Sequence, residues 1–312
     1  MEKMEQKKNL FNNPIIITLG ALLCCALWGS ATPAIKTASA ILIPEGGVPS
    51  TILFAGIRFF LAGIITIAIY SIARKRLLVF KRENLPRVLT VASFQTVIQY
   101  IFFYVGLANT TGVKGTIASG SSAFFCVLIA SLIFKQEKLT LKKILACVLG
   151  MVGIVVINLR GLEFTMNLLG DGFVILSTVA YSFSSVFMKR FSKYEDPVVI
   201  SGYQFIFGGA FMIAVGALLG GKINLSDATG IVILIYLAFL SAVAYALWGV
   251  LLKYNPVSRV TVFSFTTPIF GTILSLIFLP ESSGVDPINL IITLILVCGG
   301  ILLLNYQPKT RE

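Results

Sequence analysis

The chain contains no histidine and few charged side chains. Among its 312 residues, 25 are Lys or Arg and 13 are Asp or Glu, so charged residues make up 12% of the sequence. A soluble domain usually has about a quarter of its residues charged, because water must solvate its surface. Hydrophobic residues make up 57% of this chain. Most of the outer surface therefore has to face lipid, which excludes a soluble globular fold.

Several reaction types lack the residues that they require. Neither Asp nor Glu occurs in the middle of an apolar segment, and a proton relay inside a membrane needs such a group or a histidine. This favours facilitated diffusion or exchange over a carboxylate-driven proton pump, although a water wire or the substrate itself could carry protons. No P-loop is present to bind ATP, and the residues of a Ser–His or paired-Asp protease are missing. We therefore predict that the protein is not an enzyme and has no cofactor.

The five cysteines and the net charge of +12 also exclude common alternatives. All five cysteines lie inside apolar segments and form no CxxC pair, so we interpret them as core residues rather than disulfide partners or metal ligands. The basic residues lie in short connections between apolar segments, as they do in the cytoplasmic loops of membrane proteins. We expect no metal site and no binding to nucleic acid.

Ten segments are long and apolar enough to be membrane-spanning helices. A hydrocarbon core about 30 Å thick requires roughly 20 apolar residues in a helix. The first segment follows three lysines, as a signal peptide does, but it is too long and has no convincing cleavage site, so we expect it to be retained. The predicted spans lie near 14–36, 50–73, 86–106, 113–134 and 141–158 in the first half of the chain, and near 169–190, 198–219, 228–253, 258–279 and 287–306 in the second.

The distribution of Lys and Arg predicts the orientation of these spans. If the N-terminus is cytoplasmic, twenty Lys and Arg residues fall on the cytoplasmic face and only Lys36, Lys114, Arg160 and Lys222 fall on the other. The alternation also agrees with ten spans, because one missed helix would disturb it. We therefore predict a multi-pass protein of the cell (inner or plasma) membrane with both termini in the cytoplasm.

The two halves of the sequence resemble each other. Ser-Leu-Ile-Phe-x-x-Glu occurs at 131–137 and again at 275–281, an offset of 144. Aromatic residues recur in the same order, with Trp28 matching Tyr181 and Tyr100 matching Tyr245. Each half, 1–160 and 161–312, then holds five helices, and this odd number makes the halves enter the membrane from opposite faces. We predict two inverted five-helix repeats, an arrangement that in secondary transporters places the substrate site near the midplane.

Residues spread over both halves match a known family pattern. They are Trp28-Gly29-Ser30 with Lys36, Arg58-Phe59, Glu137, Gly150 and Gly153, then Pro268, Glu281, Gly299 and Gly300. On these residues the chain resembles the EamA-type family of the drug/metabolite transporter superfamily over nearly its whole length. Phe124 and Tyr181-Ser182 depart from the pattern. The resemblance implies two five-helix halves and transport of small solutes such as amino acids, nucleotide-related metabolites or drugs.

Polar and aromatic residues form a stripe on the third predicted span and another on the eighth. The third carries Thr96, Gln99, Tyr100, Phe103 and Tyr104 at three- and four-residue steps, and the eighth carries Ser241, Tyr245 and Trp248, with Leu252 expected on the lipid side. Such stripes suit a cavity wall, and interhelical hydrogen bonding is the alternative. The candidate substrate-binding residues are Trp28, Ser30, Arg58, Gln99, Tyr100, Tyr104, Ser122, Tyr181, Tyr245, Trp248 and Thr266.

Charged residues within or beside the spans have two possible roles. Arg58 could bind a substrate carboxylate or phosphate, or could be structural, bonding to backbone carbonyls or extending towards the outer face. Lys36 and Lys189 could attract anions at the two mouths, or anchor their helices at the membrane interface. Glu137 and Glu281 follow the repeated motif, and we interpret them as structural acids at the positive end of the next helix.

These observations favour a secondary transporter (an exporter, exchanger or facilitator) that moves small organic metabolites, amino acids or related compounds in the first place, by alternating access. The alternative is a non-transporting membrane sensor or a lipid-modifying protein. That class would have a sizeable soluble domain or a polar catalytic loop, whereas the longest connections here are about a dozen residues. The expected partners are a small-molecule substrate and the lipid bilayer, and the protein could be a monomer or a homodimer.

Overall fold

The computed structural model describes residues 10–159, 165, 167–278 and 286–305. These residues form helices joined by short connections, and none of them lies in a strand. Within the described ranges, nine helical segments are long and apolar enough to cross a membrane. The prediction of an all-helical, multi-pass membrane protein is therefore confirmed.

Five of the nine segments are single regular helices, and the other four change their helical type along their length. The regular helices are α1 (Pro14–Leu42), α2 (Val48–Ala73), α9 (Pro197–Leu218), α10 (Ala228–Tyr254) and α13 (Pro287–Asn305). The others are α3–η3–α4 (Leu85–Val91, Ala92–Ile98, Gln99–Ala108), preceded by η2 (Arg82–Asn84), then α5–α6–η4 (Gly112–Gly120, Ser122–Leu128, Ile129–Ile133), η6–α8 (Leu168–Gly172, Phe173–Phe191) and α11–η7–α12 (Val257–Thr261, Val262–Thr266, Thr267–Phe278). The short η1 (Leu10–Asn12) precedes α1.

The fifth predicted span forms a helix that is shorter than each of the nine membrane-length segments. It is α7 (Leu141–Ile157), which has 17 residues. At a rise of about 1.5 Å per residue, a helix of this length extends about 25 Å, slightly less than the hydrocarbon core. In contrast, α1 continues six residues beyond its predicted end at 36, because Ala38 and Leu42 are buried among side chains of α10.

Short polar side chains mark where several helices begin. Asn13 accepts a hydrogen bond from the N–H of Ile15 at the start of α1, and Asp196 accepts one from Val198 at the start of α9, both at 2.9 Å. Such N-caps satisfy the donors that the first helical turn leaves unpaired. These helices therefore begin at positions that the local sequence specifies.

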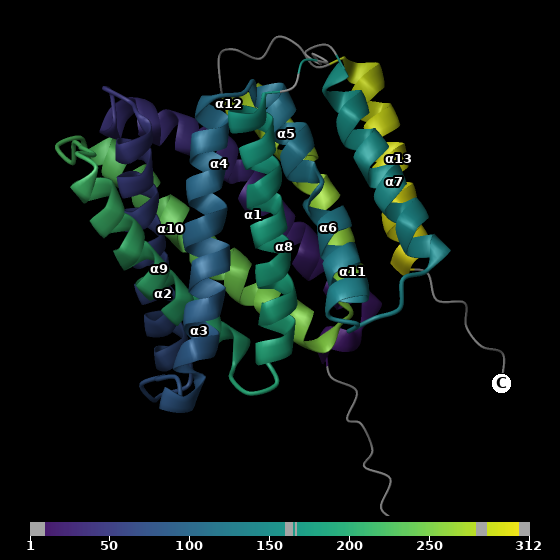
Figure 1. The fold of residues 1–312 in the computed structure, drawn as a ribbon, viewed down its shortest axis with the longest axis horizontal. Helices are drawn as coiled ribbons and strands as arrows, with labels where there is room; N and C mark the ends of the chain where they lie inside the picture. The colour runs from purple at the N-terminus through teal and green to yellow at the C-terminus, as the bar shows by residue number, and fades with distance from the viewer. Residues whose placement is uncertain (1–9, 160–164, 166, 279–285, 306–312) are drawn as a thin grey trace, which may run out of the picture.

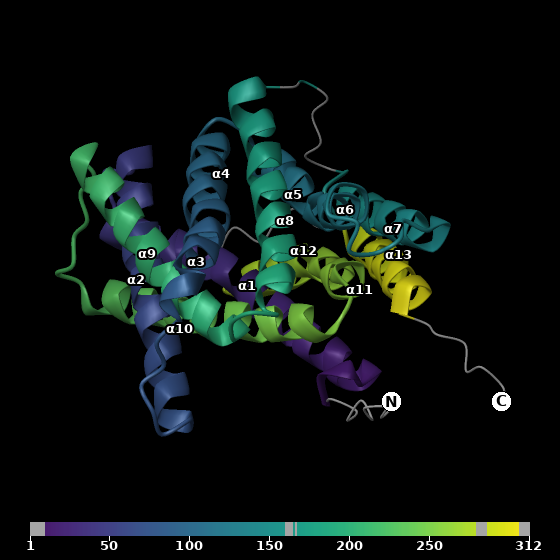
Figure 2. The same ribbon diagram turned by 60° about the horizontal axis from the view of Figure 1, so that its bottom comes forward.

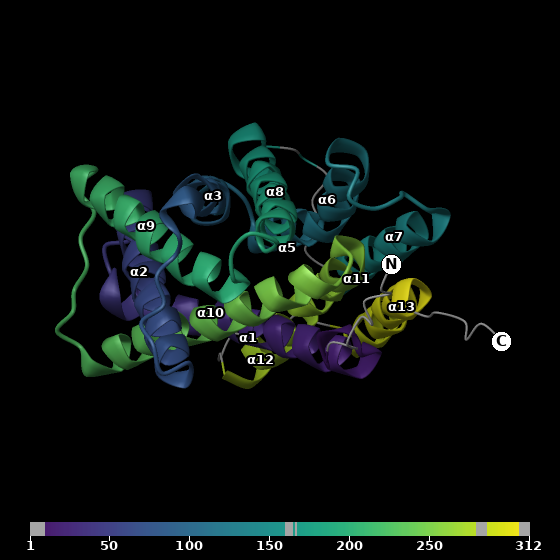
Figure 3. The same cartoon turned by 90° about the horizontal axis from the view of Figure 1, so that it is seen from below.

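Helices of the first half pack against helices of the second. α2 packs along α9 at one edge of the molecule, and α7 packs along α13 at the opposite edge (Figures 1 and 3). Between them, α1 packs on α10 and α4 packs on α8. Glycines bring the α2 and α9 backbones together: a Cβ on Gly209 would lie 2.4 Å from the backbone nitrogen of Phe60. Close approach at small residues is how helices associate in lipid.

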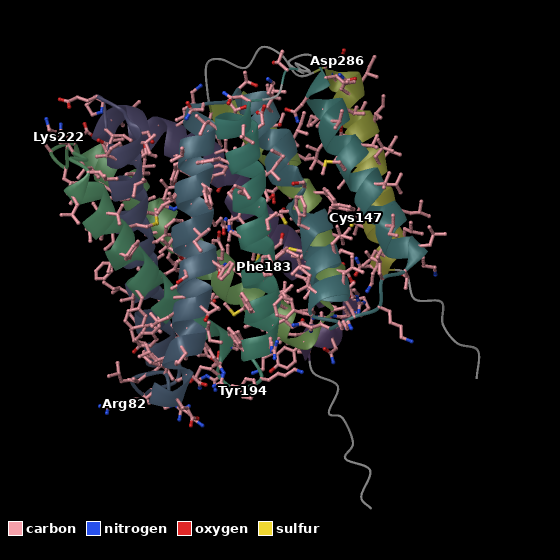
Figure 4. All side chains as sticks on the ribbon, viewed as in Figure 1. Arg82, Cys147, Phe183, Tyr194, Lys222 and Asp286 are labelled. Atoms are coloured by element: carbon pink, nitrogen blue, oxygen red, sulfur yellow. The ribbon has the colours of Figure 1, made fainter. Side chains whose placement is uncertain are left out.

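Both ends of the described chain lie on the same side of the bundle. Asn255, in the connection between α10 and α11, donates from Nδ2 to the Phe11 carbonyl at 2.9 Å, and Arg259, in the first turn of α11, donates from Nε to Asn305 Oδ1 at 3.0 Å. Figure 2 shows the start of α1 and the end of α13 on this side. Arg82 and Tyr194 also lie at this end of the molecule, and Lys222 and Asp286 lie at the other (Figure 4).

Candidate functional site

The centre of the molecule holds a cluster of aromatic rings from both halves. Tyr100 on α4 and Tyr245 on α10 meet with their hydroxyl oxygens 2.8 Å apart, so each hydroxyl is the other's hydrogen-bond partner. Phe59 on α2 stacks on Phe205 on α9, with ring centroids 5.1 Å apart and planes inclined by 9°. The structure therefore brings together Tyr100 and Tyr245, as the repeat predicted, and their role in binding stays a prediction.

Phe59 and Phe205 were not among the predicted site residues. Their rings nevertheless link the tyrosines to the rest of the cluster: Phe59 lies 4.4 Å from the ring of Tyr100, and Phe205 lies 5.0 Å from the ring of Tyr245. The sequence contained a signal for them, because they are separated by almost the same offset as the two tyrosines. Residues at equivalent positions of the two halves whose side chains contact each other lie at the interface between the halves.

Two tryptophans extend the cluster on its α1 side. The ring of Trp28 lies 5.2 Å from that of Tyr245 and 4.9 Å from that of Trp248, in edge-to-face geometry in both cases. Such pairs are favourable, because the positive edge of one ring meets the negative face of the other. Both indole N–H groups are buried and have no hydrogen-bond partner among the described residues.

Further polar atoms around the tyrosines are buried and unpaired. The ring of Tyr104 lies 5.9 Å from that of Tyr100, and Gln99 precedes Tyr100 on α4. Tyr181 on α8 is close enough to Tyr100 and Tyr245 to interact with them electrostatically. The Tyr104 hydroxyl, the Tyr181 hydroxyl and the Gln99 Oε1 atom find no hydrogen-bond partner within the part of the chain that the structure describes.

Unpaired buried polar atoms destabilise a fold unless a ligand or water bonds to them. Each such group costs about 1–3 kcal/mol, and native proteins contain few of them. Here five polar side-chain atoms of the aromatic cluster, on Trp28, Gln99, Tyr104, Tyr181 and Trp248, share this property. All five residues were predicted as cavity residues from the sequence. The arrangement can donate and accept hydrogen bonds to a flat organic molecule held against the rings.

Arg58 lies beside this cluster and is almost fully buried, with 2% of its surface exposed. Its Nε and Nη2 atoms donate to the Ser241 hydroxyl at 3.2 and 2.9 Å, and that hydroxyl donates to the Leu237 carbonyl at 2.8 Å. The guanidinium also interacts electrostatically with the phenol groups of Tyr100 and Tyr245. Arg58 therefore does not extend to the outer face, and its hydrogen-bond partner is a side chain on α10 rather than a backbone carbonyl.

A second polar pair, at positions that the repeat relates to the first, also joins the two halves. Thr96 in η3 donates to the Oε1 atom of Gln204 on α9 at 2.6 Å. Gln204 is the counterpart of Arg58, and Thr96 is the counterpart of Ser241, at nearly the same sequence offset. Gln95 Oε1 and Gln204 Nε2 are buried without a partner among the described residues. The two halves therefore build similar helix-to-helix links, one charged and one neutral.

Four predicted site residues make other contacts. The Ser30 hydroxyl is 2.7 Å from that of Tyr236 on α10. Ser122 accepts a bond from Ser182 through its backbone carbonyl, and Thr266 donates to the Phe263 carbonyl of its own helix. Lys189 donates to the carbonyls of Leu252 and Asn255, where it caps the C-terminal end of α10. These bonds favour the second of the two roles considered for Lys189, an anchor at the helix end, and its role in attracting anions stays a prediction.

The structure also differs from two further predictions, which concern the helix that Glu137 caps and the lipid-facing position of Leu252. Glu137 accepts bonds from the Ser258 N–H at 2.9 Å, the Ser258 hydroxyl at 2.5 Å and Lys143 at 2.8 Å. It therefore caps the start of α11 in the other half, and not the next helix along the chain. Leu252 is 1% exposed, so it is a core residue and not a lipid-facing one. Lys36 is exposed on α1, and Glu281 lies outside the described residues.

The fold and the central cluster define a class of helical membrane protein, and comparison with known proteins identifies its family. The profile of the EamA-like transporter family matches the chain twice, over residues 15–159 and 168–306. The chain therefore belongs to the EamA-like transporter family, which confirms the resemblance seen in the sequence. Membership makes the protein a membrane transporter by family.

Relatives from distant organisms agree with this assignment. An uncharacterized transporter of Archaeoglobus fulgidus is 27% identical over 93% of this chain and 97% of its own length. The uncharacterized transporter YvbV of Bacillus subtilis is 24% identical over 92% of this chain and 90% of its own length. A solved protein crystal structure shares the fold, with a TM-score of 0.75 and 20% identity over 92% of this chain and 95% of that one.

Proposed function

We propose that this protein is a secondary transporter that carries small organic metabolites, amino acids or related compounds in the first place, by alternating access. One observation carries the proposal: five buried polar atoms without a partner among the described residues surround an aromatic cluster between the two halves. A substrate with a flat apolar body and a carboxylate or amide group would bond to these atoms. Ring contacts contribute about 0.5–1.5 kcal/mol each beyond burial.

The alternating-access mechanism requires two halves of similar structure and opposite orientation. The double match of the family profile supports a division into residues 1–160 and 161–312. The pairing of Phe59 with Phe205 and of Tyr100 with Tyr245 supports a two-fold relation between the halves, because only residues near such an axis meet their own counterparts. Two related halves give outward-open and inward-open states of similar energy.

Ten spans agree better with the fold than nine do. The start of the described chain meets the α10–α11 connection and its end meets the first turn of α11, which supports an even number of membrane crossings between them. Counting α7 as a span satisfies this condition. The end of the bundle with Arg82 and the α6–α7 connection carries most Lys and Arg, which supports cytoplasmic termini in the plasma membrane.

The source of energy in this proposal is a substrate gradient or exchange. Titratable carboxylates and histidines in the middle of the spans would be needed to carry protons through the site, and the sequence has neither there. Arg58 supplies positive charge beside the cluster and favours a substrate that carries a carboxylate. Its bond to Ser241 links α2 to α10, so substrate binding at Arg58 would change the packing of these two helices.

Uptake by proteoliposomes tests this function. Purified protein is reconstituted and supplied with a pooled, labelled panel of amino acids and other metabolites, and the initial rate is compared with that of protein-free liposomes. We expect selective uptake of one or a few compounds with a carboxylate and an apolar side chain, competed by the unlabelled compound. Absence of uptake for the whole panel, by protein shown to be folded, would contradict the proposed substrate class.

A further inference from the structure

A pocket lies away from the aromatic cluster, at the end of the molecule where Arg82 and Tyr194 are found (Figure 4). It has a volume of about 290 Å³ and is partly open. The connection after α2, residues 74–81, forms one wall, and the connection before α9 forms the other. Charged side chains that line it are Arg74, Arg76, Lys81, Glu195 and Asp196.

The two carboxylates in this pocket are already bonded within the protein. Glu195 accepts bonds from the N–H of Lys81 at 3.0 Å, from Asn84 at 2.9 Å and from the N–H of Asp196 at 3.1 Å. Burial opposes its ionisation, but these bonds together hold the pKa of Glu195 below its usual value. Asp196 accepts from Tyr70 and caps α9. Both carboxylates are held by these bonds on the α9 side of the pocket and keep their charge, so three cations and two anions leave the lining with a net positive charge.

The cations are positioned and retain bonding capacity. Arg74 Nη2 donates to the Tyr70 hydroxyl at 2.6 Å, and its guanidinium lies over the Tyr70 ring, which fixes its position at the pocket. The Arg76 side chain has no hydrogen-bond or ion-pair partner among the residues that the structure describes. Arginine presents several N–H donors in a plane and suits phosphate oxygens.

Apolar side chains surround these cations and face outward. Ile72 and Leu77 are each 77% exposed and Val79 is 60% exposed, although all three would be unfavourable in contact with water. Leu78, between them, is buried, and its carbonyl accepts a bond from Tyr203. Cations next to outward-facing aliphatic side chains are typical of a segment at the headgroup level of a membrane.

The opposite end of the same helix pair shows that such a basic pocket is not needed to join α2 and α9. There the connection between α9 and α10 is fixed by the bond from Asn224 N–H to the Leu42 carbonyl at 2.7 Å and from Lys222 N–H to Ser50 at 3.1 Å. The Lys222 ammonium pairs with Glu45 at 3.8 Å. That end carries a single paired lysine, so the two ends of the α2–α9 pair differ in charge, in the direction that the distribution of Lys and Arg predicts.

We propose that this pocket binds the headgroup of an anionic phospholipid. The phosphate lies between Arg74 and Arg76, and the acyl chains extend along Ile72, Leu77 and Val79 into the membrane. The site goes beyond the transport function and does not depend on the identity of the transported substrate. It would hold the α2–α3 and α8–α9 connections at the membrane surface.

Lipid titration of the full-length protein tests the site. The protein in detergent is titrated with phosphatidylglycerol or phosphatidylcholine, and bound lipid is counted by native mass spectrometry. We expect preferential binding of phosphatidylglycerol, and the double variant Arg74→Gln/Arg76→Gln should weaken it by at least about tenfold. The matched control is Lys138→Gln/Lys142→Gln, which removes one exposed charge in the connection before α7 and one in the first turn of α7, and should retain wild-type binding.

Two further measurements separate the alternatives. Arg76→Gln alone leaves the Arg74–Tyr70 contact intact and should still weaken binding, which excludes misfolding as the cause. Competition by glycerol phosphate at the concentration that lipid requires would overturn the lipid assignment in favour of a free phosphate. Equal loss of phosphatidylglycerol in the two double variants, or equal binding of the two lipids, would overturn the proposal.

Discussion

At the residue scale, the unpaired polar atoms of the aromatic cluster should have opposite effects on substrate binding and on the stability of the fold. A buried N–H or hydroxyl without a partner weakens the fold, and its removal without loss of the ring should therefore be harmless to folding. The same removal deletes a contact that a substrate would use. A gain in stability together with a loss of activity on substitution is typical of residues that are kept for function.

We expect Trp248→Phe and Tyr181→Phe to lower the initial rate of uptake at least several-fold. Thermal stability in detergent should stay the same or rise, by up to about 1 kcal/mol, for Tyr181→Phe, which removes a buried unpaired hydroxyl and keeps the ring. Trp248→Phe should lower it by about 1–2 kcal/mol, because the smaller ring leaves a cavity where the buried indole was. Uptake per folded protein and the unfolding temperature are the two measurements.

The matched control is Phe239→Leu on α10, whose side chain is 47% exposed on the same helix as Trp248. It should change neither quantity. If Trp248→Phe and Tyr181→Phe transported at the wild-type rate, the cluster would be packing and the substrate site would lie elsewhere.

A second prediction at this scale concerns Glu195. Because its pKa in the folded protein is below the usual value of 4.5, its bonds stabilise the fold fully above that pH and are lost as the pH falls through the lower folded pKa. We expect Glu195→Gln to lower the unfolding temperature at pH 6. The difference from the wild type should disappear as the pH falls to about 3. A difference that stayed constant over this range would show that ionisation of Glu195 is not involved.

At the element scale, α2 and α9 form the most closely packed helix pair between the halves. Gly56 and Gly216 also face backbone atoms of the partner helix, 2.6 Å from where their Cβ atoms would be. No side chain can be added there without separating the helices. If the proposed alternating access operates, we expect the motion to occur at other interfaces, such as α1 on α12 and α4 on α8.

We expect Gly209→Ala to destabilise the protein by at least about 1–3 kcal/mol, the usual cost of overpacking, because its Cβ would meet the Phe60 backbone. Gly299→Ala is the control, since nothing lies within 4 Å of its Cβ position on α13. The unfolding temperature and the yield of monodisperse protein measure the effect. Equal stability of the two variants would mean that α2 and α9 are less closely packed than described.

The elements also show which local features could be predicted from the sequence. Each of the ten predicted apolar segments corresponds to a helix, or to a run of consecutive helices, in the structure. They could be predicted because transfer of a segment into lipid depends on the composition of that segment alone. The changes of helical type within the third, fourth, sixth and ninth predicted segments were not predicted. They depend on neighbours such as Gln204, which bonds to Thr96 in the π-helical η3.

At the scale of the whole molecule, the proposed orientation can be tested by labelling. In a variant without native cysteines, Lys81→Cys should be labelled by a membrane-impermeant reagent only from the cytoplasmic side. Lys222→Cys should be labelled only from the outside. Labelling of both positions from one side would contradict ten spans with cytoplasmic termini.

The energy source is a second property of the whole molecule. We expect uptake to continue down a substrate gradient when the pH is equal on both sides, because no carboxylate or histidine lies at mid-membrane to couple protons. Initial rates with and without a protonophore measure this. Loss of uptake on collapse of the proton gradient, while the substrate gradient persists, would contradict gradient-driven transport.

The sequence by itself determined the class of protein, the helices and the family, since composition, apolar length and repeated motifs are local properties that a chain carries before it folds. It also indicated that Tyr100 and Tyr245 should meet, because the repeat relates them. Only the tertiary structure decided which groups are partners. Glu137 caps α11 and Lys189 caps α10, while Trp28 and Trp248 keep unpaired N–H groups. These outcomes depend on how helices far apart in the sequence pack, and the order of residues along one helix does not specify its neighbour.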